Sequence, residues 1–95
     1  MDEAVAKELE CILGMVENWK LDYMKYVAGE NDEYLVEDFL EELNQTHVFP
    51  FLWSAAERGF LTRSEMSDFM GRCYEKVGEL QEAIEKAKNE KSELL

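Results

Sequence analysis

The chain has 95 residues, a formal net charge of -12 at pH 7, and 46% hydrophobic and 34% charged residues. This length suits a single domain, here residues 1 to 95, that can bury a core without disulfides or metal. Because the negative field repels phosphate groups, we expect no direct nucleic-acid binding and no membrane binding. The acidic start of the chain does not resemble a signal peptide, which favours a cytoplasmic protein.

The first predicted helix covers residues 2 to 28. Its apolar residues recur in alternating steps of four and three, which is a heptad pattern: Val5, Leu9, Ile12, Val16, Trp19, Tyr23 and Tyr26. Asp2 and Glu3 place negative charge at the start of the helix, and Gly29 suits a left-handed residue after its end. We therefore expect a long helix whose apolar seam packs against another helix.

A second, amphipathic helix is predicted over residues 32 to 44, and it has an acidic face. Seven acidic and no basic side chains occur between residues 30 and 42: Glu30, Asp32, Glu33, Glu37, Asp38, Glu41 and Glu42. Apolar residues recur at helical spacing through the same stretch. Like charges crowded together cost stability, so the face is either simply solvated or available to a positively charged partner.

A third, short helix is predicted over residues 50 to 58, with Pro50 at its start and Gly59 behind it. We expect the chain to break between it and the acidic helix, at residues 45 to 49. The densest apolar segment, residues 48 to 53, has more large side chains than one helix face can hide. Phe51 and Trp53 therefore either wedge into the core or form an aromatic anchor for another chain.

The fourth predicted helix covers residues 63 to 91, followed by a frayed C-terminal tail. Thr62-Arg63-Ser64-Glu65 is a capping box at its start. A second heptad seam follows: Met66, Met70, Cys73, Val77, Leu80, Ile84 and Ala87. Because this seam is nearly as long as the first, we expect the two long helices to pack along each other.

These elements predict an all-α protein, a small up-and-down helical bundle. Two long heptad-patterned helices form its outer legs, and two shorter helices form a broken middle leg. An alternative folds the two short helices into a hairpin against an antiparallel pair of long helices. No strand pattern or internal repeat competes with either arrangement.

The functional prediction is a non-catalytic protein-binding or assembly module, forming a homodimer and binding a basic protein partner. Glu37, Glu41 and Glu42 are the predicted contact residues on the acidic face, with Phe51 and Trp53 as the apolar contacts. We expect no cofactor and no metal site, because the soft ligands are scattered along the chain: Cys11, His47 and Cys73.

Two alternative functions stay open. Glu65-Met66-Ser67-Asp68, following an acidic helix, resembles part of the all-α nucleotide pyrophosphohydrolases. That resemblance implies a magnesium-dependent enzyme whose paired helical carboxylates bind the metal, although Glu65 is also expected to cap its helix. The other alternative is an acidic inhibitor that imitates nucleic acid on a basic protein.

Overall fold

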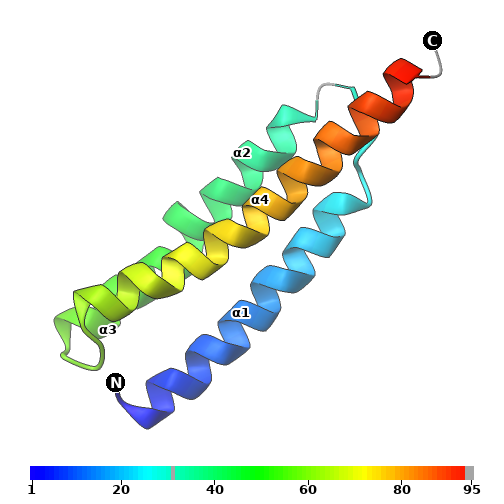
Figure 1. Ribbon diagram of the computed structural model, residues 1–95. Helices are drawn as coiled ribbons and strands as arrows, with labels where there is room; N and C mark the ends of the chain where they lie inside the picture. Colours follow the sequence, from blue (N-terminus) through cyan, green and yellow to red (C-terminus); the bar gives the residue numbers. More distant parts are fainter. Residues whose placement is uncertain (31, 94–95) are drawn as a thin grey trace.

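The computed structural model describes residues 1–30 and 32–93, and only the backbone of residues 46, 92 and 93. The elements are α1 (Glu3–Met24), α2 (Glu33–Glu41), the π-helix η1 (Glu42–Thr46), α3 (Val48–Glu57) and α4 (Arg63–Glu93). Figure 1 shows them as a small helical bundle, and the described residues contain no strand. The predicted all-α class is confirmed.

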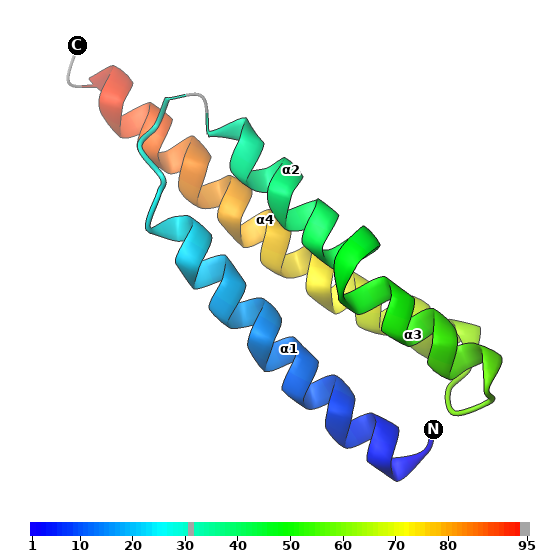
Figure 2. The ribbon, with the colours of Figure 1, turned by 180° about the vertical axis from the view of Figure 1, so that it is seen from behind.

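Three legs lie side by side in a bundle of 55 × 19 × 19 Å (Figures 1 and 2). The long helices α1 and α4 run parallel. Two ion pairs show this: Glu10 pairs with Arg72 at 3.4 Å, and further along both helices Lys20 pairs with Glu79 at 2.8 Å. The middle leg of α2, η1 and α3 packs against both long helices and runs in the opposite direction. The chain thus follows the up-down-up path and not the hairpin alternative.

One hydrophobic core runs the length of the bundle. Its buried members on the long helices are Leu9, Ile12, Val16, Phe69, Met70, Cys73, Val77, Leu80 and Ile84. The middle leg and the turn after it contribute Leu35, Phe39, Leu43, Val48, Leu52, Ala55 and Leu61. Both heptad seams therefore face inward, except that Tyr26, at the end of the first seam, is 68% exposed.

Tyr26 is exposed because α1 ends at Met24 instead of residue 28. The amides of Ala28 and Gly29 donate to Oδ2 of Asp32, at 3.0 and 2.7 Å, and so do not continue the helix. Asp32 also precedes α2, but its side chain makes no cap bond to that helix. Gly29 has the expected left-handed conformation (φ 79°), and a Cβ on it would lie 3.0 Å from the carbonyl oxygen of Ala87.

The middle leg is less broken than expected. Buried residues along it recur at the helical spacing of three or four positions, except that Leu43 and Val48 are five apart. A regular α-helix would rotate one of them out of the core. η1 takes up the additional residue through a hydrogen bond from the His47 amide to the Glu42 carbonyl at 3.2 Å, and the chain bends only at His47.

The two remaining helices start close to the predicted positions. α3 begins at Val48 instead of residue 50, which leaves Pro50 in the first turn, where its missing N–H is not needed. At α4 the capping box is present: the Glu65 amide donates to Oγ1 of Thr62 at 3.0 Å, and the Thr62 amide donates to Oε1 of Glu65 at 2.8 Å. α4 continues to Glu93. The helix thus covers residues 92 and 93, the first two of the tail that we expected to be frayed, and residues 94 and 95 lie outside the described part of the chain.

A network of four charged residues joins α1 to α4. Lys20, only 7% exposed, lies 2.7 Å from Glu17 and 2.8 Å from Glu79, and Lys76 lies 2.9 Å from Glu17. The hydrogen bond from Lys20, and to a smaller extent the one from Lys76, holds the pKa of Glu17 below its ordinary value of 4.5. Burial works against the charged form of Lys20, but its bonds to Glu17 and Glu79 outweigh this and raise its pKa above 10.5.

Because of this network, we expect the loss of stability caused by the Lys20→Met substitution to depend on pH. The lowered pKa of Glu17 stabilises the folded state above 4.5, and this contribution disappears as pH falls through the lowered value. We therefore expect the stability difference between wild type and variant to be about 1 kcal/mol smaller near pH ~3 than near pH ~7. Urea unfolding at both pH values measures it. A pH-independent difference would contradict the prediction, and Lys25→Met, at an exposed pair, is the control.

Candidate functional site

The acidic face of α2 has an exposed centre made of Glu37, Asp38 and Glu41. We call these three residues the acidic surface. They point outward because Leu35 and Phe39, on the opposite side of the same helix, are buried in the core. Glu37 and Glu41 also line a shallow depression of about 280 Å³ that continues onto η1.

The other acids of this stretch are paired or turned away from the acidic surface. Glu33 pairs with Lys88, and Glu30 pairs with Lys91, both from α4. Asp32 is buried and accepts the two loop amides described above. The sequence suggested an uncompensated face of seven acids, and the fold reduces it to the three of the acidic surface, which form no ion pair within the described part of the chain.

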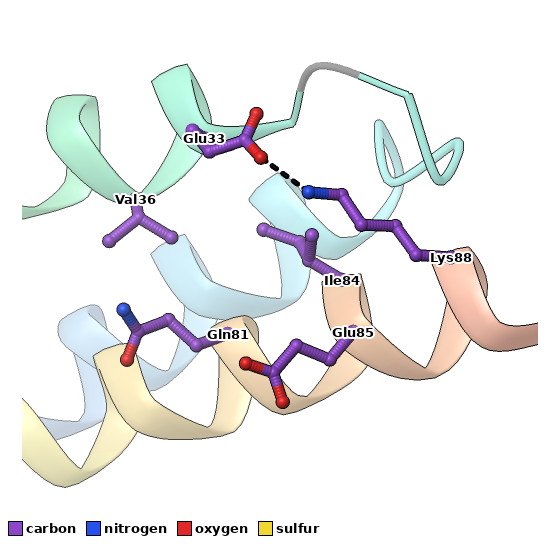
Figure 3. Close-up of a pocket in the computed structure, with 6 residues that line it drawn as sticks. All are labelled: Glu33, Val36, Gln81, Ile84, Glu85 and Lys88. Carbon is purple, nitrogen blue, oxygen red and sulfur yellow. Dashed lines mark hydrogen bonds and ion pairs between the residues drawn. The ribbon is translucent and has the colours of Figure 1, made fainter.

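Figure 3 shows the Glu33–Lys88 pair bridging α2 and α4 above a depression of about 190 Å³. The side chains of Val36 and Ile84 form its apolar wall, and those of Gln81 and Glu85 lie along α4 below. The hydrogen bond from Lys88 holds the pKa of Glu33 below its ordinary value. This depression is small, and its two oppositely charged side chains, Glu33 and Lys88, already bind each other and so do not attract a charged ligand.

Glu42, a predicted contact residue, lies apart from the acidic surface. It is half-buried, and its Oε2 is 3.4 Å from Nε2 of His47 at the bend after η1. It belongs to an open cleft of about 390 Å³ between α1 and the middle leg. The cleft, as we call it from here, is lined by Trp19, Asp22, Tyr23, Tyr26, Glu42 and His47.

Aromatic rings make most of this cleft. The Trp19 and His47 rings lie 5.8 Å apart at 40°, and Tyr23 stacks on buried Phe39 at 5.2 Å. Burial first, and then the charges of Glu42, Asp38 and Glu41, raise the pKa of Tyr23. The cleft and the acidic surface are therefore close enough for their charges to act together. The sequence interpretation missed the cleft, since the spacing of Trp19, Tyr23 and Tyr26 indicates only a heptad seam.

The two predicted apolar contact residues differ in exposure. Phe51 is half-buried and packs against the core, whereas Trp53 is 42% exposed. The Trp53 ring stacks with that of Phe49 at 6.1 Å, and the Arg63 guanidinium lies 5.9 Å from its centre. Phe60, in the turn after α3, is also 42% exposed. We call Phe49 and Trp53 the aromatic patch; the sequence interpretation did not select Phe49 or Phe60.

One carboxylate that the enzyme alternative needs, that of Glu65, has other partners in the fold. Glu65 caps α4, and its Oε2 is 3.5 Å from the N-terminal amine. Within residues 1–30 and 32–93, no group of three or more histidine, cysteine or acidic side chains is placed to hold a metal ion. In the same residues, no helix is both long enough and apolar enough to span a bilayer.

Comparison of the chain with protein-family models, with curated proteins and with solved structures finds no match. A functional proposal for this chain therefore rests on its own side chains and their surroundings.

Proposed function

We propose that the chain is a protein-binding module whose acidic surface docks a basic segment of another protein. The observation that supports this most directly is the contrast among its acids. Within the acidic stretch of residues 30–42, Glu30 and Glu33 each pair with a lysine of α4, whereas Glu37, Asp38 and Glu41, grouped on α2, have no partner among the described residues. A cation from another chain can supply that missing partner.

The cost of the acidic surface to the free protein agrees with such a role. Glu37 and Glu41 are one turn apart on α2, and like charges at this spacing destabilise a helix by about 0.2–0.5 kcal/mol. A binding partner with lysine or arginine residues would remove this repulsion. The field would also speed association at low salt, as oppositely charged surfaces do.

Neutralising the acidic surface should weaken binding while slightly stabilising the fold. For Glu37→Gln, Asp38→Asn and Glu41→Gln combined, we expect the Kd for an oligolysine peptide to rise about tenfold at low salt. This expectation assumes about 0.5 kcal/mol for each exposed ion pair. Fluorescence anisotropy measures the Kd, and urea unfolding measures the stability.

A charge-matched variant separates local docking from net charge. Glu75→Gln, Glu82→Gln and Glu90→Gln remove three exposed acids from α4 and change the net charge equally. This control should bind the peptide nearly as well as wild type. If the two triple variants bind equally, the peptide responds only to net charge, and the acidic surface is not a docking site.

We also propose that the chain forms the homodimer predicted from its sequence, and that two copies contact each other through the aromatic patch. Charges near it are balanced, with Arg58 and Arg63 beside Glu57 and Glu65, so two copies do not repel each other there as they would at α2. We expect a dimer in light scattering, strengthened by salt, and Trp53→Ala to return it to monomer. A wild-type monomer at high protein concentration would refute this assignment.

A further inference from the structure

The cleft between α1 and the middle leg combines two features that favour a positively charged ligand. Its walls are aromatic, from Trp19, Tyr23 and Tyr26, and its two carboxylates belong to Asp22 and Glu42. The faces of aromatic rings attract cations, and tryptophan does so most strongly. Asp38 and Glu41 of the neighbouring acidic surface add to the negative field here, and after burial and the charge of Glu42 they contribute to the raised pKa of Tyr23.

The two carboxylates of the cleft already have neighbours within the chain, Lys25 and His47, but an incoming cation can compete with both. Lys25 pairs with Asp22 at 3.2 Å, but both side chains are mostly exposed, at 73% and 67%. Solvent screens such an exposed pair and leaves it weak, so an incoming cation can replace Lys25. Glu42 is 3.4 Å from His47, a pair that is ionic only when the imidazole is protonated.

The shape and chemistry of the cleft suit arginine better than lysine. A guanidinium is planar, so it can lie against a ring while its N–H groups reach carboxylates at its edge. A lysine ammonium is a compact, strongly hydrated point charge that gains less from flat aromatic walls. The molecule has a similar contact of its own, since the Arg63 guanidinium lies over the Trp53 ring at 5.9 Å.

We infer that the cleft is a binding site for an arginine side chain of the basic partner. The inference rests on the proposed function, because the acidic surface beside the cleft would bind the rest of the basic segment. It adds a preference that charge alone does not supply: the partner segment has an arginine at the position that reaches Trp19, Tyr26 and Glu42.

The test compares an oligoarginine with an oligolysine peptide of equal length. In the cleft variant, Asp22→Asn with Tyr26→Ala, the Kd for the arginine peptide should rise about fivefold and that for the lysine peptide less than about twofold. Both positions are exposed, so the fold should persist, and thermal unfolding checks this. The control variant, Tyr34→Ala with Glu82→Gln, also removes one exposed tyrosine and one carboxylate and should retain the arginine preference.

A second readout reports contact with the cleft directly. In a Trp53→Phe background the emission of Trp19 alone is observed, and the arginine peptide should change it more than the lysine peptide does. If the cleft variant keeps the arginine preference, or Trp19 emission responds equally to both peptides, the cleft inference is wrong while the acidic surface can still dock basic segments. If neither peptide binds the wild type, both proposals fail.

Discussion

Phe39→Ala should destabilise the protein by about 3–5 kcal/mol, enough to unfold much of it at room temperature if its total stability is ordinary. Phe39 is 0% exposed and belongs to the hydrophobic core. Its ring stacks on that of Tyr23 at 5.2 Å, so truncation removes this contact and leaves a cavity. Chemical denaturation followed by circular dichroism measures the loss.

Phe60→Ala is the matched control, because the same side chain is removed from a position that is 42% exposed. It should cost less than about 1 kcal/mol. Phe39→Leu, which keeps most of the buried volume, should fall between the two. If Phe39→Ala and Phe60→Ala were equally mild, the middle leg would not pack in the core as described.

Asp32→Ala should have the second largest effect, a loss of about 2–4 kcal/mol, because it leaves two partly buried amides without an acceptor. Asp32 is 2% exposed, and its Oδ2 receives the N–H groups of Ala28 and Gly29. This carboxylate holds the turn after α1 in place, where Gly29 lies against Ala87 of α4. Urea unfolding measures the loss, and hydrogen exchange of the Ala28 and Gly29 amides locates it.

Asp32→Asn separates the hydrogen bonds from the side-chain volume. Its amide oxygen can accept the same two N–H groups, so we expect it to lose about 1 kcal/mol or less. Asp38→Ala, on the exposed side of α2, should be nearly neutral. Equal losses for Asp32→Ala and Asp32→Asn would mean that the two amide bonds do not explain the role of Asp32.

In the two proposals, the acidic surface and the cleft bind different parts of one basic segment. The acidic surface offers long-range attraction, which depends on salt and distinguishes poorly between lysine and arginine. The cleft offers a short-range contact that depends on the shape of the cation. The bend at His47 and the π-turn before it lie where the two meet, and such π-turns are frequent at functional sites.

Part of the candidate site could be predicted from sequence, because it depends on neighbours within one helix. Glu37 and Glu41 were expected to be exposed on an amphipathic helix, and they are exposed. Glu42 was expected beside them but lies in the cleft against α1, because it follows Phe39 by three positions and directly precedes Leu43, which places it at the edge of the buried side of the helix. The five-residue step from Leu43 to Val48 was visible in the sequence and could have located this π-turn.

By itself, the sequence determined the all-α class, the two long helices with their inward seams, and the capping box at Thr62 and Glu65. Helix propensity, apolar periodicity and caps act between residues a few positions apart, so a single chain records them. Only the tertiary structure decided where α1 ends, which acids gain a lysine partner, and that Trp19, Tyr26 and Glu42 line one cleft. Those outcomes depend on residues distant in sequence, such as Glu33 and Lys88, which meet only after the helices have packed.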